Sequence, residues 1–280
     1  MRIAVTGATG FIGRHVLSAL TQQGVDITAM LRPGTERRVW LKDIPTVEID
    51  LHNPADETFV RLGRPDVLIH LAWAGLPNYK SLHHYEDELP AQYRFLKGLI
   101  DGGLSRLVIA GTCFEYGMYS GPLSEEMQPR PANSYGFAKD CLRQQVEYLK
   151  TIRPFALTWA RLFYTYGEGQ PASSLLPQLE RAVANGDGVF NMSGGEQLRD
   201  YLPVAEVARA LVVLAQTDAD VGVVNVCSGR PISVRRFVED WLNERGHSIS
   251  LNLGHYPYPD YEPMAFWGDR RKLDRILDTK

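Results

Sequence analysis

The sequence predicts an α/β fold in which a doubly wound parallel sheet is joined to a smaller mixed α/β lobe. Over the first 165 residues, short apolar runs alternate with segments of helical periodicity. The runs are mostly apolar throughout, which is typical of parallel strands buried on both faces. A glycine-rich turn, TGATGFIG at residues 6–13, separates the first run from the first helical segment. Strand, helix and strand in this order favour a doubly wound sheet.

Each element can be placed from its residues. Strands are predicted at residues 2–6, 26–31, 46–50, 66–72, 106–111, 156–163 and 223–227. Helices are predicted at residues 14–24, 88–101, 134–152, 205–216 and 233–246. The third of these helices must end before Pro154, because proline interrupts a helix. After about residue 165 the segments become shorter and mixed, and the aromatic-rich stretch 256–263 is predicted to be a loop.

Composition excludes several classes of protein. The 280 residues are 44% hydrophobic and 22% charged with a net charge of −3, so a strongly basic nucleic-acid footprint is absent. Apolar runs are too short to span a bilayer, and MRIAVTG reads as a strand rather than as a secretion signal. Cys113, Cys141 and Cys227 are far apart, and His83-His84 has poor metal-ligand spacing and is expected in an exposed loop. We expect a cytoplasmic protein without a bound metal.

The turn at residues 6–13 has the composition of a phosphate-binding loop. Gly7 allows the tight turn, Gly10 lets the backbone approach a pyrophosphate at the helix N-terminus, and Gly13 lets helix and strand pack closely. Three glycines alone are a weak signal, but their place between strand and helix favours a dinucleotide site over a plain turn. We therefore interpret 1–165 as a dinucleotide-binding domain to which 200–228 returns, and 166–280 mostly as a substrate-binding lobe.

A hydroxyl, a phenol and an ammonium are predicted to meet at one end of the sheet. Thr112 follows the fifth strand, and Tyr135 and Lys139 lie four residues apart on one face of a helix. Free tyrosine titrates near ~10, and a nearby lysine cation favours the phenolate. Lowering the tyrosine pKa by about three would need roughly 4 kcal/mol of interaction that favours the phenolate over the phenol. We expect Tyr135 to be an acid/base, Thr112 its partner and Lys139 the group that lowers the tyrosine pKa.

With these motifs placed, the sequence resembles the extended short-chain dehydrogenase/reductase superfamily, specifically its NAD(P)-dependent nucleotide-sugar branch of epimerases, dehydratases and 4-ketoreductases. The resemblance runs nearly end to end and implies a Rossmann fold. It is carried by TGATGFIG, Asp50-Leu51, LIHLA (68–72), GTCFEYG (111–117), YGFAK (135–139), ARLFYTYG (160–167), EQLRDYLPVAEVARAL (196–211) and NVCSG (225–229).

The resemblance implies roles residue by residue. Residues that would bind the cofactor are Gly7, Gly10, Phe11, Ile12, Gly13, Arg32, Asp50, Leu51, Leu71, Ala72 and Lys139. Residues that would contact the substrate are Trp73, Thr112, Tyr135, Tyr164 and Arg199. Asp50 and Leu51 would flank the adenine, and Arg199 would contact the phosphates of the sugar donor. Helices 88–101 and 135–152 correspond to the family's dimer bundle, so a homodimer is expected.

Departures from the family pattern narrow the reaction. The resemblance implies that 4,6-dehydratases carry Asp-Glu after the strand-end threonine, whereas this chain has Cys113 and Phe114, which argues against dehydration. Tyr164 stands where many relatives have Asn. The Arg-x-Gly-Asp that the family often has near the C-terminus is replaced by DYEPMAFWGD (260–269), so the family's sugar-diphosphate contacts in this segment cannot be assigned to residues of this chain. Similar C-terminal segments occur in 4-ketoreductases that finish deoxysugars for surface polysaccharide such as O-antigen.

The residue that ends the second strand bears on the choice of cofactor. A dinucleotide fold usually has an acid there to hold a ribose hydroxyl, but this chain has Arg32. An arginine offers a planar donor fork that suits a 2′-phosphate, and Arg37 and Arg38 follow in the same loop. We therefore expect NADP(H) rather than NAD(H), although a solvated surface arginine is the alternative.

These observations together predict an enzyme. The expected reaction is hydride transfer from NADPH to C4 of a dTDP-, CDP- or GDP-linked 4-keto-6-deoxyhexose, because an epimerase would regenerate its own cofactor. The alternatives are a nucleotide-sugar epimerase of the same fold, a reductase of a different ketone, and a non-catalytic NADP(H)-binding regulator. The Tyr/Lys pair argues against the regulator, and Arg199 in the RDY segment argues for a nucleotide sugar.

Overall fold

The computed structural model describes residues 1–279, and in that part of the chain seven parallel strands form one sheet. Their order across the sheet is β11-β7-β5-β4-β1-β2-β3. The bounds are β1 Arg2–Thr6, β2 Asp26–Leu31, β3 Thr46–Glu48, β4 Val67–His70, β5 Arg106–Thr112, β7 Ala156–Leu162 and β11 Gly222–Val226. The doubly wound α/β prediction is confirmed, since the order reverses at β1.

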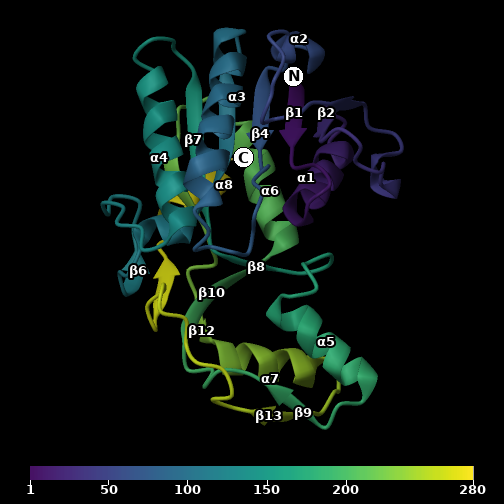
Figure 1. Ribbon diagram of the computed structural model, residues 1–280, viewed down its shortest axis with the longest axis vertical. Coiled ribbons are helices and arrows are strands. Elements are labelled where there is room, and N and C mark those ends of the chain that lie inside the picture. Colours follow the sequence, from purple (N-terminus) through teal and green to yellow (C-terminus); the bar gives the residue numbers. More distant parts are fainter. Residues whose placement is uncertain (280) are drawn as a thin grey trace.

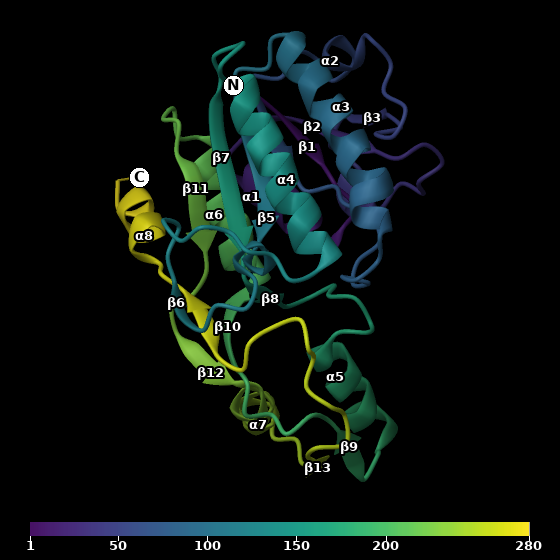
Figure 2. The ribbon, with the colours of Figure 1, turned by 60° about the vertical axis from the view of Figure 1, so that its left-hand side comes forward.

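Helices cover both faces of this sheet. Helices α1 (Phe11–Gln22) and α6 (Val204–Ala215) pack on one face, and α3 (Leu89–Asp101) and α4 (Ser134–Leu149) pack on the other. Figure 2 shows α3 and α4 in front of the strands and α1 and α6 behind them. Central strands such as β4 are buried at every position, which explains their unbroken apolar sequence.

The chain crosses between the sheet and a second part of the molecule more than once. We call residues 164–203 and 228–268 the second lobe; α6 and β11 lie between these two segments and belong to the sheet (Figure 1). Its elements are β8 Tyr164–Tyr166, α5 Leu175–Asn185, β9 Val189–Asn191, β10 Leu198–Pro203, β12 Pro231–Ser233, α7 Val234–Glu244, β13 Ser250–Asn252 and β14 Phe266–Gly268. A separate apolar cluster that includes Leu179 and Val238 holds α5 against α7.

Short elements complete the description. They are the 3₁₀ helices η1 Val39–Leu41 and η3 Cys113–Tyr116, the π-helix η2 His84–Glu88, the helices α2 Thr58–Arg61 and α8 Arg271–Leu277, and the strand β6 Gly121–Leu123, which pairs with β14. The predicted helix at 134–152 ends earlier, at Leu149, and the predicted strand at 46–50 ends at Glu48. Within residues 1–279, each helix is too short or too polar to cross a membrane.

Candidate functional site

The glycine turn between β1 and α1 lies at the carboxyl end of the sheet. Gly7 has φ +68°, and a Cβ built on it would lie 2.9 Å from the Ala72 backbone nitrogen. A Cβ on Gly13 would lie 2.1 Å from the Gly7 carbonyl oxygen, so α1 could not pack here with any larger residue. The Gly10 N–H donates to the Gly7 carbonyl at 2.9 Å and closes the turn directly before α1. Backbone N–H groups at such a helix start suit an anion.

A crevice of about 310 Å³ opens beside this turn, where the strand order reverses. Eight residues predicted from the sequence line it together: Gly7, Gly10, Arg32, Asp50, Leu51, Leu71, Ala72 and Trp73. Phe11, Ile12 and Gly13 lie in the first turn of α1. The donor-rich turn at one end and the apolar Ile49 and Leu51 at the other fit a dinucleotide cofactor: the turn would hold its pyrophosphate and the apolar pair its adenine.

The three arginines after β2 are placed differently. Arg32 lines the crevice together with Thr35. The Arg37 guanidinium donates to the carbonyls of Leu41, Lys42 and Ile44 at 3.0–3.3 Å, which commits it to its own loop. Arg38 lies 3.7 Å from Glu36 at the surface. Arg32 is therefore the cation of this loop that faces the crevice.

A buried polar network underlies the crevice, and no sequence pattern predicted it. The Thr6 hydroxyl bonds His70 Nδ1 at 2.9 Å, and His70 Nε2 bonds Gln92 Oε1 at 2.6 Å. Gln92 Nε2 donates to Glu88 at 2.9 Å, and His52 Nε2 lies 2.7 Å from the same carboxylate. Burial and the nearby Lys139 lower the pKa of His70 to about 3, so its ring is neutral at pH 7.

Glu88 stays ionised in this network although it is buried. Burial alone would raise its pKa, but hydrogen bonds from Gln92, the Ala74 N–H and His52 outweigh burial and hold the pKa below its usual value. Glu88 therefore adds a negative charge to the crevice wall, at a position that sequence analysis did not select.

The predicted hydroxyl, phenol and ammonium are positioned by the ends of β5 and α4. Thr112 is the last residue of β5 and caps η3 by accepting from the Phe114 N–H at 3.3 Å. Asn133 caps α4 by accepting from the Gly136 N–H at 2.8 Å, which fixes the turn that carries Tyr135. Tyr135, Thr112 and Lys139 are all buried, and the Thr112 hydroxyl bonds the Tyr135 phenol.

Lys139 is held by groups that carry no formal charge. Its side chain is 2% exposed, Nζ donates to the Ala110 carbonyl at 2.9 Å, and Nζ lies 4.0 Å from the centroid of the Trp73 ring. Burial lowers the pKa of Lys139 to about 7, against the more distant charges of Glu115 and Glu88, which raise it. The aromatic face of Trp73 stabilises the ammonium that burial disfavours.

Tyr135 is surrounded by rings, and its titration differs from the expectation. The ring centroids of His84, Tyr79 and Trp73 lie 5.3, 5.7 and 5.9 Å from that of Tyr135. Burial raises the pKa of the Tyr135 phenol well above its usual value, and the bond from Thr112 offsets this only in part. The pKa of Tyr135 is therefore raised in this structure and not lowered as expected, because desolvation of the phenol is the largest effect on it.

His84 is buried, so the prediction of an exposed loop is wrong for this residue. It begins η2, and its Nδ1 accepts from Trp73 Nε1 at 3.1 Å. Its Nε2 lies 2.9 Å from the Asn78 carbonyl, which makes Nε2 the protonated nitrogen. Burial lowers the pKa of His84, so a neutral ring packs beside Tyr135. The polar sequence around it conceals this burial.

Two predicted substrate residues, Tyr164 and Arg199, lie away from the crevice, in β8 and β10. Arg199 is 1% exposed; its Nη2 lies 2.9 Å from Glu262 Oε1, and its Nη1 donates to the Leu198 carbonyl at 2.8 Å. The Tyr164 hydroxyl donates to the other oxygen of Glu262. Arg199, Tyr164 and Glu262 thus form one buried group, and the predicted contact between Arg199 and phosphates stays a prediction.

The residues that replace Asp-Glu after Thr112 are not suited to acid/base work. Cys113 and Phe114 are both buried in η3, and burial raises the pKa of the Cys113 thiol far above neutrality. The neighbouring Glu115 is fully buried and serves the fold: it accepts from the Thr112 N–H at 2.8 Å and pairs with Arg161 at 2.7 Å. A proton-removing pair for dehydration is not formed here.

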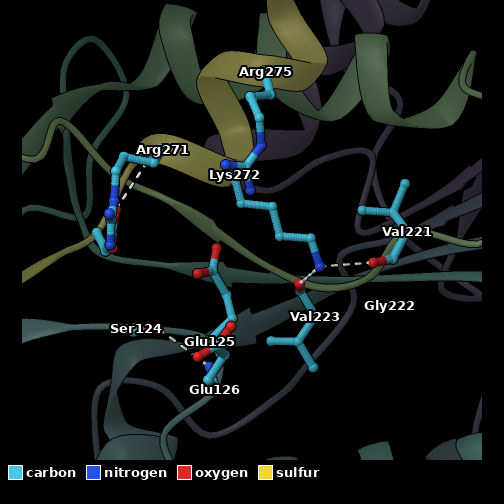
Figure 3. A pocket seen from close by; sticks show the side chains of 10 residues that line it. Ser124, Glu125, Glu126, Val221, Gly222, Val223, Arg271, Lys272 and Arg275 are labelled. Carbon is cyan, nitrogen blue, oxygen red and sulfur yellow. Dashed lines mark hydrogen bonds and ion pairs between the residues drawn. The ribbon is translucent and has the colours of Figure 1, made fainter.

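Another cavity, of about 580 Å³, lies at the amino end of β11 and beside α8 (Figure 3). Two of its cations are engaged locally: Lys272 donates to the carbonyls of Val221 and Val223, and Arg271 pairs with Asp269. Figure 3 shows Glu125 and Glu126 across the cavity from Lys272 and Arg275. Because its charges are balanced and it lies at the end of the sheet opposite to the glycine turn, this cavity is not the candidate site.

Comparison with known proteins adds relatives of known activity. Residues 3–227 match the model of the family described as "NAD dependent epimerase/dehydratase family". The dTDP-6-deoxy-L-talose 4-dehydrogenase (NAD(+)) of Aggregatibacter actinomycetemcomitans is 29% identical over 270 residues, 96% of this chain and 99% of that protein. The GDP-6-deoxy-D-talose 4-dehydrogenase of the same organism is 26% identical, over 99% of this chain and 91% of that one. A solved structure, MoeE5 in complex with UDP-glucose and NAD, is 27% identical with a TM-score of 0.84, over 99% and 92% of the two chains.

Proposed function

Because the chain belongs to the NAD dependent epimerase/dehydratase family and is therefore an NAD(P)-dependent enzyme, we propose that it reduces the C4 ketone of a nucleotide-linked 4-keto-6-deoxyhexose. The product would be a deoxysugar donor of the kind used for surface polysaccharide. The observation that carries the proposal is the convergence of Thr112, Tyr135 and Lys139 at the end of the sheet where the crevice opens. The names of two relatives, both 4-dehydrogenases of 6-deoxytalose nucleotides, support C4 as the reacting carbon, since the reverse of that reaction is a ketone reduction.

The residues of the chain perform the proton half of the reaction. NADPH, when bound in the crevice, would supply the hydride for C4. Tyr135, whose raised pKa keeps the phenol protonated at pH 7, donates its proton to the C4 oxygen as that oxygen gains charge. Thr112 donates a hydrogen bond to the same oxygen and steadies it. The Lys139 ammonium then stabilises the tyrosinate that remains.

Arg32 supports NADP(H) as the cofactor. It lines the crevice beside Thr35, while Arg37 and Arg38 are engaged elsewhere in the loop. A guanidinium at this position favours a 2′-phosphate, whereas an acid would repel it.

The second candidate function is a nucleotide-sugar epimerase, which the name of the matching family favours. The same three side chains would then pass a proton in both directions with no net use of cofactor. Net oxidation of NADPH separates the two functions.

A panel of dTDP-, CDP- and GDP-linked 4-keto-6-deoxy sugars with NADPH tests the proposal through the loss of absorbance and identification of the product. We expect stoichiometric oxidation with at least one member, and a Tyr135→Phe variant slower by about a hundred-fold or more, since it lacks the proton donor. Full activity of Tyr135→Phe would refute the assigned role. Turnover of a nucleotide sugar without net oxidation would establish the epimerase instead.

A further inference from the structure

A segment rich in aromatics and prolines joins the two parts of the molecule. We call residues 256–264 the strap; it arches from β13 towards the sheet and returns to β14 (Figure 2). On the sheet side, Lys80 Nζ lies 2.6 Å from Asp260, and the Tyr261 ring packs 5.9 Å from Tyr79. On the second lobe, Glu262 lies 2.9 Å from Arg199. The strap therefore contacts both sides at once.

The contact between Glu262 and Arg199 balances charge but leaves a hydrogen-bond donor unused. Both side chains are buried, at 8% and 2% exposure. Arg199 Nη2 lies 2.9 Å from Glu262 Oε1, but within residues 1–279 it makes no well-aligned hydrogen bond. A buried donor without an acceptor is costly, and a buried arginine needs a compensating anion. Glu262 supplies the charge, and a better-placed anion would also supply the missing acceptor.

The strap is built so that it can be exchanged. Pro257, Pro259 and Pro263 cannot donate backbone hydrogen bonds, and the backbone bonds of the strap lie at its two ends, where the Tyr256 N–H donates to Met192 and the Met264 carbonyl accepts from the Leu198 N–H. Between these ends, side chains provide the contacts described above. The Lys80–Asp260 pair is exposed, and such pairs stabilise little. The Tyr261 ring packs on Tyr79, which in turn lies 5.7 Å from Tyr135, so the strap also covers the approach to the candidate acid.

We propose that Glu262 is an internal anion that occupies Arg199 until the diphosphate of a nucleotide sugar takes its place, and that this exchange makes the enzyme specific for diphosphate-linked substrates. The inference rests on the substrate class of the proposed function. A diphosphate presents several acceptor oxygens to the Arg199 fork, which one carboxylate at this angle does not. A ligand without a diphosphate leaves the strap closed over Tyr79.

The test measures binding of dTDP, UDP and GDP by calorimetry, without cofactor or ketone. Glu262→Gln keeps the shape of the side chain and removes its charge. The state in which Arg199 is free to bind a diphosphate is then populated more, so we expect at least one nucleoside diphosphate to bind about ten-fold more tightly. The corresponding monophosphates gain less. Glu196→Gln is the matched control, because this exposed carboxylate contacts the strap through Tyr258 and no cation within residues 1–279 pairs with it.

Two further measurements complete the test. When Arg199 is also replaced by Gln, we expect Glu262→Gln not to raise the affinity for diphosphates, because the guanidinium that would bind them is absent. In the unaltered protein, dTDP accelerates hydrogen exchange at Tyr261–Met264 and dTMP does not. Unchanged or weaker diphosphate binding by Glu262→Gln, together with unaltered exchange in the unmodified chain, would overturn the proposal. Because neither assay involves ketone reduction, a failure of the proposed reaction would be seen separately.

Discussion

At the scale of single residues, we propose that Arg32 decides the choice of cofactor. We predict that Arg32→Asp weakens NADPH binding by roughly ten- to hundred-fold and NADH binding far less, because an attractive charge beside the 2′-phosphate becomes a repulsive one. Fluorescence titration with both cofactors measures the ratio. Arg38→Asp is the control in the same loop, since Arg38 pairs with Glu36 and should leave the ratio unchanged. Equal effects of Arg32→Asp on both cofactors would contradict the assignment.

Lys139 carries a stability effect whose sign follows from its titration. Its pKa is about 7 in the folded chain and near ~10.4 when unfolded, so the unfolded state binds more protons between these values and folding is favoured as pH rises. Burying the ammonium therefore lowers the free energy of unfolding by its full amount below pH 7, and this destabilisation disappears as the pH approaches ~10.

We predict that Lys139→Met melts at a higher temperature than the unaltered protein at pH 6, and that the difference narrows as the pH rises towards ~10. Thermal unfolding followed across this range measures it. Lys97→Met, which removes an exposed partner of Asp101, should show no such pH dependence. A constant difference between the Lys139 variant and the parent would show that lost packing, not charge, is the cause.

Residues were predictable from the sequence where a short motif fixes both their identity and their spacing. Gly7, Thr112, Tyr135 and Lys139 belong to such motifs, and the structure gathers them at the carboxyl end of the sheet. Glu262 was not predictable, because its partner Arg199 lies more than sixty positions away and nothing local signals the pair. Local polarity likewise misrepresented His84, which is buried between Trp73, earlier in the chain, and Tyr135, fifty-one positions later.

At the scale of the element, the first turn of α1 depends on a close approach between two backbones. We predict that Gly13→Ala abolishes cofactor binding and lowers the melting temperature, because its Cβ would lie 2.1 Å from the Gly7 carbonyl. Gly98→Ala in α3 is the control: the space around it is open, and alanine in a helix should stabilise by about 1 kcal/mol. A Gly13→Ala protein that bound NADPH normally would refute this account of the turn.

Whole elements were predicted best where the apolar pattern of the sequence is strong, either as a continuous run or at helical spacing. β1 and β2 were placed at their observed bounds, and α6 within one residue, because their apolar patterns are unbroken. The three-residue strands of the second lobe, such as β12 and β13, were missed. Strands this short carry no periodicity, and their pairing depends on partners distant in sequence.

At the scale of the whole molecule, the homodimer remains a prediction, and an exposed apolar face supports it. Phe137 and Tyr148 are 49% and 69% exposed on one face of α4, and Tyr85 of η2 packs against Phe137. We predict that the protein sediments as a dimer and that Phe137→Glu with Tyr148→Glu sediments as a monomer. Val39→Glu, which alters an exposed apolar residue in η1, should remain dimeric. A monomeric unaltered protein at tens of micromolar would contradict the prediction.

The place of α6 and β11 in the sheet has a consequence for the growing polypeptide. Helix α6 covers one face of the sheet together with α1, and β11 pairs with β7, yet both come from residues 204–226. A nascent chain that has emerged as far as β7 therefore exposes apolar surface on that face until some sixty more residues have left the ribosome. Residues 164–203 of the second lobe are synthesised while the sheet is still incomplete. At this stage, binding of a chaperone to the exposed apolar face would compete with the packing of α6 and β11.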